Sequence, residues 1–193
     1  NGTVPQGQAG IYISASGVRI YGLSIKGFTF GIGIDATECI IGDFGKGNQI
    51  VGGGTNAESG IVIWSGNNIV VRGNVVGLNA SASAPEGVIP CCAIKISIGG
   101  LGAEQVLVEG NHLGCSPATR SEFGIDMEGS QITIVKNIIG TDSTGTQDFG
   151  FKRNINSWSA GLTDVLIQDN TIAYADTTGI RLIANVQQVK MAR

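Results

Sequence analysis

The chain has 193 residues, of which 31 are glycine and only 4 are proline, and its formal net charge is −3. This length suits one domain, which we expect to span residues 1–193. A composition of 42 % hydrophobic and 14 % charged residues excludes intrinsic disorder. The negative charge disfavours nucleic-acid binding, and no apolar run reaches the roughly 18–20 residues of a membrane helix.

A motif of glycine, isoleucine, any residue and a large apolar residue recurs along the chain. It reads GIYI at Gly10, GIGI at Gly31, GIVI at Gly60, GIDM at Gly124 and GIRL at Gly179, with AIKI at Ala93 and NINS at Asn154 as variants. Successive motifs begin between 21 and 33 residues apart. Such self-similarity predicts a repeat architecture in which each unit buries its apolar face against its neighbours.

A short β-branched run follows six of the seven motifs. It reads VRI at Val18, IVV at Ile69, VLV at Val106, ITI at Ile132, VLI at Val165 and VKM at Val189. In four repeats an asparagine stands five residues after the start of this run, at Asn74, Asn111, Asn137 and Asn170. We expect these asparagines to stack at one corner, because asparagine tolerates a left-handed backbone and stacked amides hydrogen-bond to each other. The second repeat, around CIIGDFGKGNQIVGGG, departs most from the pattern.

The spacing predicts an all-β fold, a single-stranded right-handed parallel β-helix (solenoid) of about seven coils. Short segments with alternating β-branched residues favour strands over helices. An antiparallel sandwich is the alternative, but it would need Asn-Gly or Asp-Gly hairpin turns between longer strands. It would also give no reason for the repeated motif. At a strand spacing near 4.8 Å the coils would stack into a rod of roughly 34 Å.

Several stretches resemble bacterial right-handed parallel β-helix repeat proteins with NVISGN-type and GNxIGTDxTGT-type units. The resemblance is carried by the segment from GNQIVGGG to GLNASASA, by KNIIGTDSTGTQDFG at 136–150 and by ASGVRIYGLSIKGF at 15–28. It extends from about residue 9 to residue 182. The resemblance implies a secreted or surface-exposed bacterial protein and no settled activity.

Outward-facing side chains of the stacked motifs provide the candidate site. The residue between the two apolar positions, and the residue after the motif, should point away from the core. These positions hold Asp35, Trp64, Lys95, Asp126, Glu128 and Arg181, with Ser157 from the sixth repeat. Charged groups and an exposed indole along one face are typical of polysaccharide binding. The predicted substrate-binding residues are Asp35, Trp64, Lys95 and Arg181.

Asp126 and Glu128 form the candidate catalytic pair. They lie two residues apart on one strand face, which places their carboxyl groups roughly 5–8 Å apart, within the range of paired acid/base carboxylates. A hydrolase or lyase is the expected class if the protein is an enzyme, although the NTD, GHG and RIK elements of polygalacturonase-like enzymes are missing. Lys95 could instead simply neutralise two ordinary surface acids. A second function class therefore stays open, a structural or adhesive module of a surface protein.

The ends of the chain bear on that second class. The chain opens on NGTVPQGQ with no signal-peptide pattern, and neither end supplies an obvious capping helix. Because solenoids need capped ends, we expect either a fragment of a longer protein or a homo-oligomer formed through the uncapped terminal coils.

No cofactor and no metal site are expected from the motifs, with one open alternative. His112 is the only histidine, which excludes a multi-histidine metal site and makes a partly exposed turn histidine the expectation. Asp142 and Asp148 flank a polar loop and could hold calcium through oxygen ligands.

Four cysteines lack the spacing of a zinc site. Cys39 is expected to face inward. Cys91 or Cys92 could form a disulfide with Cys115 in an oxidising compartment, and buried free thiols are the equal alternative.

Overall fold

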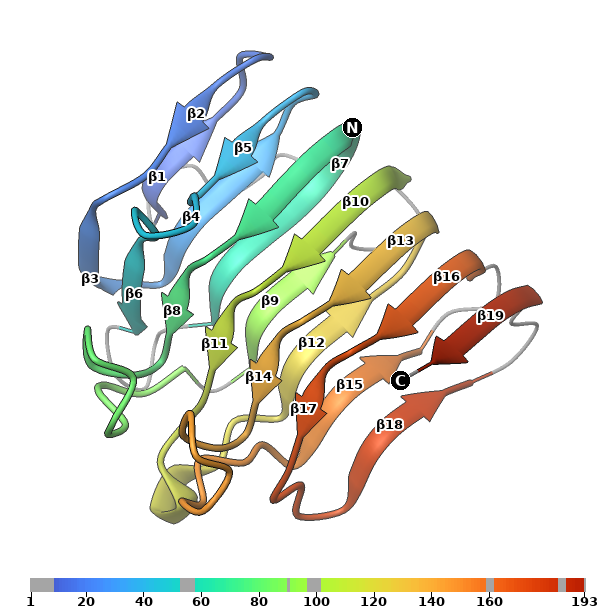
Figure 1. The fold of residues 1–193 in the computed structure, drawn as a ribbon. Coiled ribbons are helices and arrows are strands. Elements are labelled where there is room, and N and C mark those ends of the chain that lie inside the picture. The colour runs from blue at the N-terminus through green and yellow to red at the C-terminus, as the bar shows by residue number, and fades with distance from the viewer. Residues whose placement is uncertain are drawn as a thin grey trace.

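The computed structural model describes residues 9–52, 58–89, 91–96, 102–158, 162–183 and 187–192. Within these ranges the chain is all-β, with one short 3-10 turn, η2 (Pro117–Thr119). No helix in the described part of the chain is long and apolar enough to cross a membrane. Figure 1 shows strands of successive repeats lying side by side from the N-terminal to the C-terminal end of the stack.

The seven Gly-Ile motifs form one parallel ladder, here named ladder A. Its strands are β1 (Ala9–Ile13), β4 (Phe30–Asp35), the first half of β7 (Ser59–Arg72), β9 (Cys92–Ile96), β12 (Phe123–Met127), β15 (Arg153–Ser157) and β18 (Thr178–Leu182). The motif isoleucines pair directly with one another from Ile11 to Ile180. The prediction that these motifs stack in parallel is confirmed.

Two more parallel ladders accompany the first. Ladder B contains β2 (Arg19–Ile20), β5 (Ile40–Ile41), the second half of β7, β10 (Ala103–Glu109), β13 (Ser130–Val135), β16 (Thr163–Gln168) and β19 (Gln187–Ala192). Ladder C contains β3 (Ser24–Phe28), β6 (Gln49–Gly52), β8 (Val75–Val76), β11 (His112–Leu113), β14 (Ile138–Ile139) and β17 (Thr171–Ile172). β7 joins ladders A and B into a 13-stranded sheet, and ladder C is a separate 6-stranded sheet. The chain therefore visits A, B and C in turn in each of the first six repeats, and the seventh contributes strands to A and B.

Every pairing between named strands is parallel, so the antiparallel sandwich is excluded for them. Among the described residues, antiparallel contacts occur only as isolated bridges in two loops, Leu78 with Pro85 and Thr141 with Asp148.

The core lies between the three ladders and consists mainly of stacked isoleucine and valine. Ile32, Ile61, Ile94 and Ile125 are fully buried, and burying one such side chain stabilises the fold by about 1.5–3 kcal/mol. The motif begins with glycine because ladder C leaves no room for a side chain there. A Cβ on Gly31 would lie 2.3 Å from Cγ2 of Ile50, and a Cβ on Gly60 would lie 2.4 Å from Cγ1 of Val76.

An asparagine ladder runs through the corner between ladders B and C. Its members are Asn48, Asn74, Asn111, Asn137 and Asn170. The Oδ1 of each of the last four accepts bonds of 2.9–3.0 Å from the backbone N–H and the Nδ2 of the asparagine before it. The predicted stack is confirmed, and Asn48 extends it into the second repeat, where four extra residues precede the asparagine.

The expectation that these asparagines adopt a left-handed backbone is wrong. None of the five has a positive φ, and the residue before four of them does, at Gly73 (65°), Gly110 (62°), Lys136 (56°) and Asp169 (53°). Asparagine is therefore needed for its amide, which satisfies buried backbone groups of the neighbouring repeat, and not for its backbone freedom.

Replacing one rung of the asparagine ladder tests this account. In the Asn111→Ala variant the Asn74 N–H and the Val71 carbonyl lose their partner. Leaving buried polar groups unpaired costs about 1–3 kcal/mol each, so we expect the free energy of unfolding to fall by at least about 2 kcal/mol in chemical denaturation. The control is Asn67→Ala, whose side chain is exposed and whose effect should stay within about 0.5 kcal/mol. Equal effects of the two changes would contradict the ladder's role.

Candidate functional site

The outward face of ladder A carries one continuous row of side chains, in direct register. In chain order the row contains Tyr12, Gly33, Val62, Lys95, Asp126, Asn156 and Arg181. The predicted placement of Lys95, Asp126 and Arg181 in one row is confirmed. Ser157 was expected in this row, but it pairs with Leu182 and is fully buried. Asn156 occupies the outward position, because side chains alternate along a strand.

Two buried polar residues, Asp126 and Asn156, and the partly buried Arg181 lie together at the C-terminal end of this row. Asp126 is 8 % exposed, Asn156 is fully buried, and Asn156 Nδ2 donates a 2.8 Å hydrogen bond to Oδ1 of Asp126. Within the described residues, Asn156 Oδ1 and Arg181 Nη1 are buried without a hydrogen-bond partner. Buried polar atoms are nearly always paired in native proteins. These two atoms, on neighbouring strands, are therefore a buried acceptor and a buried donor that have no partner in the protein.

The environment of Asp126 favours its protonated form. Burial raises the pKa of the Asp126 carboxyl, and the nearby charge of Glu128 adds to the rise, while the Asn156 hydrogen bond and the charge of Lys95 oppose it. Two neighbouring carboxyl groups in unlike surroundings are the arrangement that separates a general acid from a base. Asp126 and Glu128 are thus two nearby carboxyl groups, and burial raises the pKa of Asp126.

The N-terminal part of the face differs from the prediction. We expected an exposed indole at Trp64, and this is wrong, because Trp64 is only 5 % exposed. A bulge pairs Asp35 with Ser65 and leaves Trp64 as the extra residue. Its ring lies over Gly33, where a Cβ would approach Cζ3 to 2.2 Å, and it packs against Phe30 and Tyr12 at centroid distances of 5.5 and 5.8 Å.

Asp35 lies at the edge of this aromatic cluster. Its carboxylate accepts hydrogen bonds from the Ser65 hydroxyl and, at 3.3 Å, from the Tyr12 hydroxyl. The predicted substrate-binding roles of Asp35 and Trp64 stay predictions, and the structure places both residues apart from the Asp126 group, at the first repeats of the stack.

An exposed indole does lie on this face, at Trp158. The side chain is 48 % exposed, and the Arg181 guanidinium lies 4.4 Å from its ring centroid. Arg153 lies 5.5 Å from the same ring, and Phe123 meets it edge-on at 5.9 Å. Its outward position could have been predicted from the sequence, because Trp158 directly follows β15 just as Glu128 directly follows β12.

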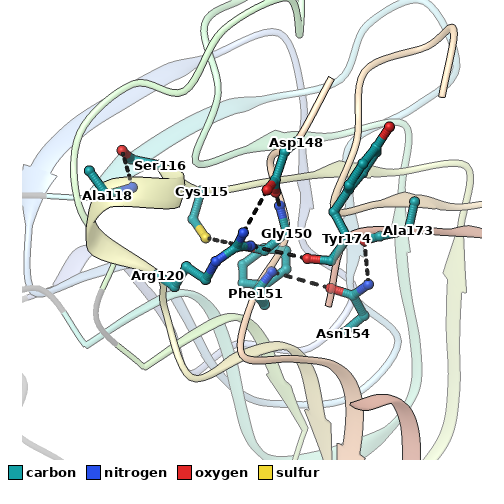
Figure 2. A network of polar contacts seen from close by, with 10 residues as sticks. All are labelled: Cys115, Ser116, Ala118, Arg120, Asp148, Gly150, Phe151, Asn154, Ala173 and Tyr174. Atoms are coloured by element: carbon teal, nitrogen blue, oxygen red, sulfur yellow. Dashed lines mark hydrogen bonds and ion pairs between the residues drawn. The ribbon is translucent and has the colours of Figure 1, made fainter. Parts of the chain in front are cut away.

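The loops beside ladder C are held together by Arg120, as Figure 2 shows. Its guanidinium forms a 2.6 Å ion pair with Asp148 and donates to the carbonyls of Gly150 and Tyr174 at 2.7 and 3.0 Å. Cys115 is buried and its thiol donates to the Gly150 carbonyl at 3.0 Å. Asp148 and Cys115 thus belong to a structural brace between neighbouring repeats.

The cysteines and the Asp142 loop bear on the disulfide and calcium alternatives. All four cysteines are free thiols, so Cys115 is joined to neither Cys91 nor Cys92 in this structure. The Asp142 carboxylate accepts bonds from the Thr144 hydroxyl and the Thr146 and Gln147 N–H groups, which hold its pKa far below the usual range. The described ranges contain no group of three or more His, Cys, Asp or Glu side chains suited to a metal ion.

His112 packs on a neighbouring loop. It begins β11, is half-buried, and its Nε2 lies 2.6 Å from the Thr141 carbonyl oxygen. Burial lowers its pKa. This matches the expected partly exposed histidine.

No protein-family model matches the chain, and no curated protein is significantly similar to it.

Neutralising Asp126 tests whether this carboxyl group is held at a cost to stability. The pKa of Asp126 is higher in the folded state than its unfolded value of about 3.9. The protonated carboxyl group therefore contributes fully to the free energy of unfolding below about pH 3.9. This contribution is lost as the pH rises through the folded-state pKa. We therefore expect Asp126→Asn to raise the unfolding free energy at pH 7 by about 0.5–2 kcal/mol, and to change it little near pH 3.

Thermal and chemical unfolding at both pH values provide the measurement. The exposed Asp164→Asn variant is the control, with an expected change below about 0.5 kcal/mol at either pH. A D126N variant that is destabilised at pH 7 would show that the carboxylate is a structural ion.

Proposed function

We propose that this chain is a right-handed parallel β-helix of a secreted or cell-surface bacterial protein, and that it binds acidic polysaccharide on the outward face of ladder A. The stacking of seven repeats through three parallel ladders supports the β-helix. The rows on its outward face run along the stack. An extended polymer lying along such a row meets one new side chain per repeat, at intervals near 4.8 Å.

The observation that carries this proposal is the combination of Trp158 with the unpaired atoms beside it. A half-exposed indole backed by Arg181 and Arg153 offers a flat apolar surface for a sugar ring. Beside it, Asn156 Oδ1 is a hydrogen-bond acceptor and Arg181 Nη1 a donor without a partner in the protein. Neither Lys95 nor Arg181 forms a salt bridge within the described residues, which favours sugars that carry carboxylates.

Asp126 and Glu128 extend the proposal from binding to processing. In this extension the pair would serve as the two carboxyl groups that glycoside hydrolysis needs, one as acid and one as base or nucleophile. Cleavage by a lyase would instead yield unsaturated uronates.

Binding is tested by calorimetric titration with uronate-containing and neutral oligosaccharides. We expect saturable binding to the acidic ligands, and a weakening of about tenfold or more, equivalent to at least ~1.4 kcal/mol, in each of Trp158→Ala and Arg181→Gln. The control Phe44→Ala removes an equally exposed aromatic ring, 56 % exposed, from the corner between ladders B and C and should bind like the parent. Absence of saturable binding to either class of sugar, or equal losses in all three variants, would refute this assignment.

Processing is tested separately by assaying new reducing ends and unsaturated products. If the pair is catalytic, Asp126→Asn and Glu128→Gln should each lower turnover by about 10²-fold or more while leaving binding largely intact. Binding by the parent protein without any product would limit the function to recognition.

A second candidate is a structural or self-associating module. The observation in its favour lies at the C-terminal end of the described stack, where β18 and β19 each pair on one side only. Ile172, Ile180 and Met191 line a hollow of about 130 Å³ there, and Met191 is 61 % exposed. Sedimentation analysis at several protein concentrations distinguishes self-association from polysaccharide binding. If the module self-associates, we expect concentration-dependent oligomers without added sugar.

A further inference from the structure

The indole of Trp158 lies against side chains from three neighbouring strands. Phe123 begins β12 and meets the ring edge-on at a centroid distance of 5.9 Å, and the Arg181 guanidinium on β18 lies 4.4 Å from the ring centroid. Arg153, which begins β15, lies 5.5 Å from the same centroid and 5.7 Å from the ring of Phe123. The ring is thus half-exposed and yet surrounded by two cations and one aromatic group.

Trp158 and Arg153 reach toward each other along β15. They stand five residues apart, which corresponds to roughly 16 Å along an extended strand. The guanidinium carbon of Arg153 nevertheless lies only 5.5 Å from the indole centroid, so both long side chains must bend over the strand between them. Asn156 lies between them at an outward position and is fully buried, as expected beneath such a pair.

The two arginines beside the indole differ in their own partners. An ion pair of 3.8 Å joins Arg153 Nη1 to Glu122, and the Arg153 N–H donates to the Glu122 carbonyl at 2.9 Å. Glu122 also pairs with the ammonium group of Lys152. Arg181 forms no salt bridge within the described residues. Arg153 is therefore tied to a carboxylate of the preceding repeat, whereas Arg181 has no acidic partner there.

The order of the indole ring bears on the affinity for the ligand proposed above. A side chain that becomes fixed only on binding loses conformational freedom at the expense of affinity, whereas one that is fixed beforehand does not. A planar guanidinium can stack on an aromatic ring and pair with a carboxylate at the same time. Arg153 does both, because it links Glu122 on one side to Trp158 on the other.

We propose that Glu122 and Arg153 are positioning residues for the Trp158 indole. Glu122 fixes the guanidinium of Arg153, and that guanidinium, together with Phe123, holds the ring over β15. Neither Glu122 nor Arg153 needs to touch the ligand. The role in binding rests on the proposed polysaccharide function, whereas the order of the ring is a property of the free protein.

NMR relaxation of the indole N–H groups measures this order directly, because the chain has only two tryptophans. Trp64, packed in its aromatic cluster, is the internal reference, and a Trp158→Phe variant assigns the two signals. In the parent protein we expect both indoles to be as rigid as the backbone. In Glu122→Gln and in Arg153→Gln the heteronuclear NOE of Trp158 alone should fall, because an exposed ring that is no longer held reorients on the ps–ns timescale.

Two further variants separate positioning from a general loosening of the fold. Lys152→Gln removes the other partner of Glu122 but keeps the guanidinium beside the ring, so the Trp158 signal should stay unchanged. In the double variant E122Q/R153Q the loss of order should equal that in R153Q alone, since Glu122 acts through Arg153. Exposed ion pairs contribute little to stability, so all these variants are expected to fold. A Trp158 indole that stays rigid in both single variants, or that loosens equally in K152Q, overturns the proposal.

Titration with uronate oligosaccharides separates this inference from the proposed function. If the parent protein binds them, E122Q and R153Q should bind about threefold to tenfold more weakly, and K152Q should bind like the parent. Net charge does not explain this pattern, because E122Q removes a negative charge that would repel an acidic ligand.

Each outcome of the titration bears on one of the two proposals. Unchanged binding by E122Q and R153Q, although their Trp158 ring has loosened, would overturn the positioning role in recognition. If the parent protein binds no sugar, the polysaccharide proposal fails, and the NMR measurement alone decides whether Glu122 and Arg153 hold the ring.

Discussion

The whole structure depends on the register between neighbouring repeats. No strand in the described stack satisfies its backbone or buries its isoleucine alone, because both partners belong to the repeats on either side. The asparagine ladder links the same repeats through polar contacts. The Oδ1 of each asparagine accepts a hydrogen bond from the backbone N–H of the asparagine one repeat earlier. The stability of stacked repeats is the sum of many equivalent nearest-neighbour contacts, so displacing one strand also affects the repeats on either side.

Register also builds the candidate site. Residues roughly 30 positions apart in the chain become neighbours on the outward face, as Lys95, Asp126, Asn156 and Arg181 do. The core sets their spacing and the outward positions are free to vary. A face made in this way can carry chemistry that contributes nothing to folding. The buried carboxyl of Asp126 and the unpaired atoms of Asn156 and Arg181 lie at such outward positions.

The face is not uniform along the stack. Its first repeats are closed over by an aromatic cluster of Trp64, Phe30 and Tyr12, and its last repeats expose Trp158 above charged residues. The difference arises from one extra residue in β7, which turns Trp64 onto Gly33. Between these parts lie Cys91 and Cys92, whose N–H groups share the Glu58 carbonyl, so that a local bend replaces the extended strand.

Sequence reasoning identified the elements that depend on short-range periodicity. The seven Gly-Ile motifs, the run that follows each of them and four of the five asparagines can be read from alternation and spacing, because parallel stacking repeats the same local requirement at each level. The row containing Lys95, Asp126 and Arg181 follows from the same alternation.

The sequence alone therefore determined the repeat, the residues that face the core, and the alternate positions along each strand whose side chains face outward. Only the tertiary structure decided which outward residues are exposed, since the bulge that leaves Trp64 as an extra residue depends on a shift of one residue. Such a shift reverses the side to which a strand residue points, and its cost or gain is set by the neighbouring repeat rather than by adjacent residues in the chain.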